Sequence, residues 1–225
     1  MKKVFSILII SSAFFAANAQ KDLFQNQLKI YQSAIKYNDY NTAINALYEA
    51  QVLKPNRTDL RDTLCMVYFS AERYVQAYLL SQDILKATPE NTTILEISAT
   101  SKNILGLGKE ALEDFEKLQK AKPQLYFQYQ IATLQYQLKR IGECLVTLDK
   151  IITNENSATE SVSISLGNNQ SQKVPVKAAA LNIKGIIALD LSKPEEAKNL
   201  FNDALKVFPE FALAKGNLQS VEGKK

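Results

Sequence analysis

The sequence predicts an all-α fold built from a repeated helical hairpin, interrupted once by a segment with the pattern of a β-strand. Prolines set the repeat: Pro55, Pro89 and Pro123 follow one another at a constant period of 34, and Pro209 follows after two more periods and one insertion. An alanine lies twelve positions before each of these prolines, at positions 43, 77, 111 and 197. A fixed period of this length with helical spacing inside it predicts stacked helical hairpins.

The N-terminal segment 1–19 has the pattern of a secretory signal peptide. Two lysines precede an apolar run from Val4 to Ala17, and Ala17-Asn18-Ala19 supplies the small residues of a cleavage site. This run is shorter than the roughly 20 residues that a membrane-spanning helix needs, so an uncleaved anchor is the weaker alternative. No cysteine follows the run to carry a lipid, and no later segment is apolar enough to span. We expect cleavage near Gln20 and export, most simply to a bacterial periplasm.

The repeats follow in order once each proline is counted as position 32. The predicted repeats span 24–57, 58–91, 92–125, 126–157 and 178–211. Apolar or small residues recur at positions 8, 20, 24 and 27, where two helices of a hairpin approach each other and then pack on the next hairpin. The fourth repeat fits least well, because it has Leu145 where alanine is expected, Asp149 at position 24 and Ser157 in place of proline.

With this spacing the chain resembles the tetratricopeptide repeat family from about Phe24 to its end. The resemblance implies a right-handed α-solenoid of about five helical hairpins. Residues 158–177 form an inset between the fourth and fifth repeats, and a final helix over 210–222 is expected to cap the apolar face of the last repeat.

The inset contains ESVSISLGNNQSQKVPV, Glu160 to Val176, in which apolar and polar residues alternate on both sides of a Gly/Asn turn. This pattern is typical of a β-hairpin, and Pro175 requires that the second arm is an edge or ends there. An isolated hairpin is marginal in water. Its apolar side chains therefore either pack on the fourth and fifth repeats or dock a partner, and disorder is the third alternative. These side chains are Val162, Ile164, Leu166, Val174 and Val176.

Composition argues against catalysis. The chain has no histidine, which excludes the usual triads and HExxH zinc sites. Its two cysteines, Cys65 and Cys144, fall in different repeats and are expected to be buried rather than bridged. The net charge is +4, or +2 without the two leader lysines, which gives no basis for nucleic-acid binding. We expect no cofactor, no metal and no enzyme activity.

The resemblance also implies a working surface, because first-helix residues at positions 2, 5, 9, 12 and 13 line a concave groove in the family. On this chain these positions are mainly apolar or acidic, and the basic clamp for a C-terminal carboxylate is absent. Such a groove fits an apolar helix or an extended peptide. The alternative is that several of these residues pack on a neighbouring helix, since the frame could slip by one. The predicted contacts are Gln32, Lys36, Asp59, Asp62, Met66, Phe69, Glu96, Asn103, Phe127, Gln130, Leu134, Leu138, Asn182 and Ile186.

The sequence therefore predicts a non-catalytic scaffold for protein–protein interaction in the bacterial cell envelope, which binds a protein or peptide in the groove. Two other functions stay open: a carrier of a small ligand or glycan, and an accessory subunit of an outer-membrane assembly machine. The partner and the oligomeric state do not follow from the sequence.

Overall fold

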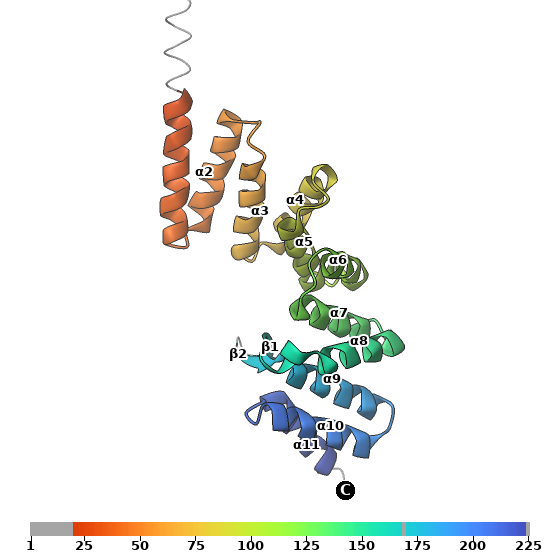
Figure 1. Ribbon diagram of the computed structural model, residues 1–225. Helices are drawn as coiled ribbons and strands as arrows, with labels where there is room; N and C mark the ends of the chain where they lie inside the picture. The colour runs from red at the N-terminus through yellow and green to blue at the C-terminus, as the bar shows by residue number, and fades with distance from the viewer. Residues whose placement is uncertain (1–19, 168–169, 224–225) are drawn as a thin grey trace, which may run out of the picture. The chain divides into compact units, whose positions relative to one another are not determined.

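The computed structural model describes residues 20–167 and 170–223 (Figure 1). The predicted signal peptide and two residues of the predicted hairpin turn, Asn168 and Asn169, lie outside the described residues. The chain divides into two compact units, of which the first ends at Leu105 and the second begins at Gly106.

The first unit is a series of antiparallel helical hairpins, in which consecutive helices pack on each other and α3 also lies against α5. Its core includes Leu47, Leu64 and Ile94, all nearly or fully buried. Residues 20–36 are helical and are followed by α2 (Tyr40–Leu53), α3 (Asp59–Ser70), α4 (Tyr74–Ala87) and α5 (Thr92–Ile104).

The second unit continues the hairpins and contains a two-stranded antiparallel sheet. The helix α7 packs on α6 and α8 and also lies against α9, while α11 packs on α10. Its elements are α6 (Gly108–Ala121), α7 (Leu125–Gln137), α8 (Ile141–Thr153), the 3-10 helix η1 (Glu155–Ala158), β1 (Ser161–Gly167), β2 (Gln170–Pro175), α9 (Val176–Asp190), α10 (Pro194–Val207) and α11 (Ala212–Glu222). The predicted fold class, helical hairpins with a small β-hairpin, is confirmed.

The second helices share a small buried residue in their first turn. The fourth residue of α2, α4, α6 and α10 is an alanine without solvent exposure, as the spacing predicts. In α8 the fourth residue is Cys144, which is also fully buried and lies one position short of a full period after Ala111, whereas Leu145 is only half-buried.

The fourth hairpin therefore begins at Leu125, one residue earlier than predicted. The shift places Leu148 and Ile151 at positions 24 and 27, and both are fully buried. Asp149, predicted at position 24, is exposed and pairs with Lys184. The physical reason is that packing selects the residues that fit the helix contact, and a spacing one shorter than the period satisfies it here.

The strand-like inset forms the predicted hairpin, with Val162 opposite Val174 in an antiparallel register. Both valines are buried in the core of the second unit. The second arm ends at Pro175, so the prediction that Val176 lies in it is wrong: Val176 is the first residue of α9 and is buried, and its N–H donates to the Glu160 carbonyl (2.9 Å).

The side chain of Gln172 fixes the hairpin to the turn between α10 and α11. Its Oε1 accepts from the backbone N–H of Ala212 (3.0 Å), and its Nε2 donates to the carbonyl of Glu210 (2.5 Å). Of the five predicted docking side chains, the three valines are buried, Ile164 is half-buried and Leu166 is exposed. The hairpin therefore packs on the second unit, and the buried valines cannot contact a partner directly.

Both cysteines are free and buried. The thiol of Cys65 donates to the Ala77 carbonyl (3.5 Å), and that of Cys144 donates to the Ala132 carbonyl (3.2 Å). Burial raises the pKa of Cys65 to about 12 and that of Cys144 to about 11. Both thiols are therefore protonated and poorly nucleophilic near neutral pH. Across the described helices, none combines the length and the apolar character needed to cross a membrane.

Candidate functional site

In the first unit, the first helices of two hairpins present parallel rows of side chains. Asp62, Met66 and Phe69 follow i, i+4, i+7 spacing on α3, so they share one side of the helix. On α5, which lies against α3, Glu96 and Asn103 occupy the positions one full period after Asp62 and Phe69. We call this surface the α3–α5 face; it comprises Asp62, Met66, Phe69, Glu96, Asn103 and Ile104.

The centre of the α3–α5 face is apolar. Met66 is 40% exposed and Ile104 is 51% exposed. Phe69 is half-buried, and its ring packs edge-on against Tyr74 of α4 with 5.7 Å between the ring centroids. The aromatic ring is therefore held in place, while the flexible methionine beside it can adapt to a contact.

The acidic residues at the start of α3 are held by neighbouring polar groups. The carboxylate of Asp59 forms a two-point ion pair with Arg57, both N–O distances being 2.7 Å. The hydrogen bond from Arg57 lowers the pKa of Asp59. Asp62 accepts a hydrogen bond from the Asn91 side chain (2.9 Å). Asp62 therefore lies at the edge of the α3–α5 face in a fixed position, whereas Arg57 offsets the charge of Asp59.

The two predicted contacts in helix 20–36, Gln32 and Lys36, lie near its C-terminal end; Gln32 is exposed, and so is Lys36. The ammonium of Lys36 lies 5.6 Å from the centroid of the Tyr37 ring, a cation–π distance. This single basic residue of the predicted groove is therefore partly engaged by its own neighbour.

In the second unit, three predicted groove contacts are wrong because they are core residues. Phe127 is 1% exposed and packs on Phe115 of α6, with 6.2 Å between ring centroids. Leu134 is fully buried in the same unit. Asn182 of α9 is buried, and its Oδ1 accepts from Asn217 of α11 (2.9 Å). For the two α7 residues the one-residue slip of the frame is the reason, since it turns them toward α6.

The corrected frame brings tyrosines to the surface that the sequence analysis missed. Tyr126, Tyr129 and Tyr136 lie half-buried along α7, and Thr133 completes the row. The hydroxyl of Tyr136 donates to Oδ2 of Asp190 at the end of α9 (2.8 Å). We call this surface the α7–α9 face; it comprises Tyr126, Tyr129, Thr133, Tyr136, Ile186 and Asp190.

The remaining predicted contacts of the second unit, Gln130, Leu138 and Ile186, are half-buried. Burial and then the hydrogen bond to Asp190 raise the pKa of Tyr136 above its usual value. The Tyr136 hydroxyl therefore stays protonated in the physiological range and can donate. A small residue at 144, rather than the expected one at 145, was the signal in the sequence that would have corrected the frame.

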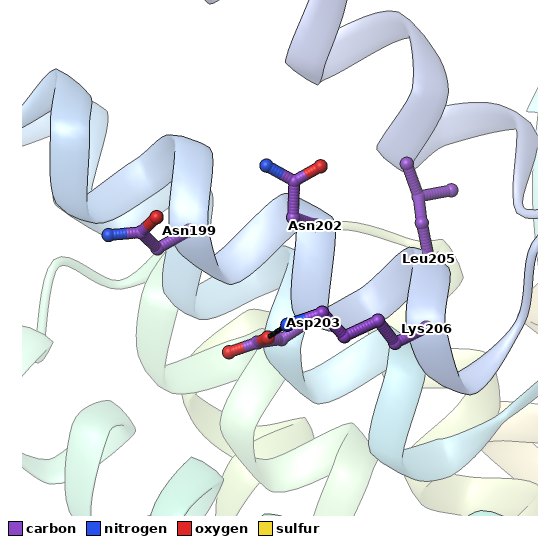
Figure 2. Close-up of a pocket in the computed structure, with 5 residues that line it drawn as sticks. All are labelled: Asn199, Asn202, Asp203, Leu205 and Lys206. Carbon is purple, nitrogen blue, oxygen red and sulfur yellow. Dashed lines mark hydrogen bonds and ion pairs between the residues drawn. The ribbon is translucent and has the colours of Figure 1, made fainter.

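Two hollows lie elsewhere on the second unit. The one in Figure 2 is lined by Asn199, Asn202, Asp203, Leu205 and Lys206, all from α10, and Lys206 pairs with Asp203 (2.8 Å). A hollow formed by one helix does not converge on a ligand. The other, of about 260 Å³, lies between the α6–α7 turn and η1, and is lined mainly by polar side chains: Gln119, Gln124, Gln128, Asn154, Asn156 and Glu160.

The described residues contain no group of three or more cysteine, aspartate or glutamate side chains that could hold a metal ion. What they do bring together is a set of apolar, aromatic and hydrogen-bonding groups on first-helix faces, which is the chemistry of binding.

The fold is that of known tetratricopeptide repeat structures. A tetratricopeptide repeat protein from Parabacteroides merdae ATCC 43184 matches with a TM-score of 0.70 and 17% identity, over 90% of this chain and 73% of that one. YrrB, described as a TPR protein with an unusual peptide-binding site, matches with a TM-score of 0.67 and 15% identity, over 86% and 90%. MamA matches at 0.66 and 12%, over 85% and 95%. No family model and no curated protein matches the sequence.

Proposed function

We propose that this chain, which has the fold of tetratricopeptide repeat proteins, is a non-catalytic scaffold that binds a protein or peptide segment on its first-helix faces. The α3–α5 face carries the proposal. It presents the exposed side chains of Met66 and Ile104 beside the carboxylates of Asp62 and Glu96. A segment with apolar residues and an adjacent lysine or arginine complements such a surface.

The α7–α9 face supports the same function by different chemistry. Half-buried tyrosines offer large contact area at low cost in side-chain entropy, together with hydroxyl groups that orient a ligand. The hydrogen bond between Tyr136 and Asp190 holds one of these rings in position before binding. Pre-positioned contacts reduce the entropy that binding must overcome.

The similarity to YrrB, a TPR protein with a peptide-binding site, gives the proposal outside support. The similarity is one of fold, and the contacts proposed here rest on the side chains of this chain alone.

Selection of binding peptides tests the function directly. The full chain, displayed against a random peptide library, should enrich sequences that combine apolar residues with a basic one. Fluorescence anisotropy then measures the affinity of an enriched peptide. Met66→Glu should weaken it at least tenfold. Leu79→Glu changes an exposed apolar residue of the same unit, on the second-helix surface of α4, and should leave it unchanged. Equal effects of both variants would contradict the assignment.

The scaffold is placed in the bacterial cell envelope, after export to the periplasm. The support is the sequence of segment 1–19, with its lysines, short apolar run and small residues at the cleavage site. Mass spectrometry of the chain recovered from a periplasmic fraction should give the mass expected for a start near Gln20. Recovery of the intact chain from the cytoplasm would contradict it.

A second candidate function, binding of a small polar ligand such as a glycan, is favoured by the amide-lined pocket beside η1. Gln128 and Glu160 would supply the donor and acceptor for hydroxyl groups. A ligand bound there raises the unfolding temperature as its concentration increases. A thermal-shift screen of soluble oligosaccharides, repeated on Gln128→Ala, separates this function from peptide binding.

A further inference from the structure

The exposure of Ile30 is unusual for its position in the repeat. Ile30 is 42% exposed, whereas the residues at the same position in the next three hairpins, Leu64, Ser98 and Ile131, are 2%, 0% and 7% exposed. In the fifth hairpin the equivalent Lys184 forms an ion pair with Asp149 of α8. This position therefore faces the second helix of the preceding hairpin. Within the described residues nothing precedes helix 20–36, so Ile30 has an apolar side chain for a contact that is missing.

Ile30 belongs to a larger apolar surface. Leu23, Ile30 and Tyr37 recur at every seventh position along helix 20–36 and its end and form one stripe, and they are 53%, 42% and 72% exposed. A hollow of about 350 Å³ joins Leu23 to Tyr48 and Val52 of α2, two more exposed apolar residues. We call this surface the first-hairpin end face: Leu23, Gln27, Ile30, Tyr37, Tyr48 and Val52.

The last helix of the second unit has a different surface. On α11 the exposed residues are small or polar apart from Leu213, which is 38% exposed. Repeat solenoids need such a polar outer surface at a free end. A head-to-tail stack would cover the apolar first-hairpin end face with this polar helix and would continue as an open filament. A head-to-head contact instead pairs two apolar surfaces and closes after two copies.

We propose that two copies of this chain associate head-to-head through the first-hairpin end face, with their 20–36 helices antiparallel. When Ile30 lies on the two-fold axis, the stripe is self-complementary, because Leu23 of one copy meets Tyr37 of the other. The same register places Lys21 opposite Asp39 of the other copy, and both residues are exposed. The contact thus pairs apolar with apolar residues and opposite charges with each other. It does not depend on the proposed peptide binding.

Light scattering after size-exclusion chromatography tests the association. The full chain is produced from Met1, and its N-terminus is read by mass spectrometry in the same preparation. The expected molar mass is twice that of one chain. Ile30→Glu should reduce it to one chain while circular dichroism remains helical. Val146→Glu places the same charge at an exposed apolar residue of α8 and should leave the dimer intact. A monomeric wild-type chain, or a dimer that survives Ile30→Glu, overturns the proposal.

Self-crosslinking tests the register. Ile30→Cys should form an intermolecular disulfide under mild oxidation, because a two-fold axis brings the residue onto its own copy. Val146→Cys should not. The native Cys65 and Cys144 are buried and do not compete. A dimer in which Ile30→Cys fails to crosslink would contradict the antiparallel arrangement.

Discussion

Gly185 of α9 lies against the ring of Phe201 of α10 so closely that a Cβ atom at residue 185 would stand 2.5 Å from Cε1 of the ring. Phe201 is fully buried, so its ring has no room to move away. Gly185→Ala should therefore lower the free energy of unfolding by about 1–3 kcal/mol, the usual cost of overpacking a core. Urea denaturation followed by circular dichroism measures it.

Gly216 of α11 provides the matched control. A Cβ atom there would have no neighbour within 4 Å, and alanine favours a helix over glycine by about 1 kcal/mol. Gly216→Ala should therefore stabilise the protein or leave it unchanged. If both substitutions destabilise equally, the close contact between α9 and α10 is not the reason.

The corrected frame of the fourth hairpin predicts a difference between adjacent residues. Cys144 is fully buried at the contact between α7 and α8, whereas Leu145 is half-buried. Cys144→Phe should destabilise the protein by about 1–3 kcal/mol through overpacking, and Leu145→Phe should cost less. The midpoints of urea unfolding give the comparison. The opposite order would restore the frame that begins at residue 126.

This slip shows where reasoning from the sequence stopped. The constant period predicted the helical hairpins, and the alanines at 43, 77, 111 and 197 are all buried at helix contacts. The period could not reveal that one spacing is shorter by one, because cysteine and alanine can fill the same small space. Phe127 and Leu134 were assigned to the groove for this reason, and the tyrosines of α7 were missed.

The inset was predictable as a hairpin but its role was not. Alternation and the Gly/Asn turn are local signals, and they predicted β1 and β2. Whether the valines pack or dock depends on residues far along the chain, such as Phe211, which shares their core cluster. Gln172 was not singled out, because its partners at 210 and 212 are backbone groups that carry no sequence signal.

The side chain of Gln172 should stabilise the second unit. Gln172→Ala removes two hydrogen bonds to the α10–α11 turn, and a net contribution of about 1 kcal/mol each is typical. We expect a loss of about 1–2 kcal/mol in the free energy of unfolding. Gln170→Ala changes an exposed glutamine of the same strand and should have little effect. Equal stability of the Gln172→Ala variant would show that the turn is held without this side chain.

Alkaline pH should destabilise the first unit through Tyr68. Burial, and then the hydrogen bond with the Tyr48 hydroxyl, whose oxygen lies 2.7 Å away, raise the pKa of Tyr68 from 10.0 to about 12. The folded state holds this proton more tightly than the unfolded chain. Its contribution is therefore complete below about pH 10 and is lost as the pH rises toward 12.

Unfolding free energies measured on either side of pH 10, at about pH 9 and about pH 11.5, report this dependence. Tyr68→Phe removes the ionisable group, so the variant should lose less stability between the two values than the wild type. An unchanged difference would assign the alkaline loss to other groups.

Site-specific photo-crosslinking tests the proposed scaffold function most directly. A photoreactive phenylalanine analogue is placed at Met66, on the α3–α5 face, or at Leu79, on the outer side of α4, and cells carrying the full chain are illuminated. The account predicts a discrete crosslinked protein partner at Met66, lost when Asp62 is changed to lysine, and no such product at Leu79. Crosslinks at Leu79 alone, or equal crosslinks at both residues, would contradict binding on the first-helix faces.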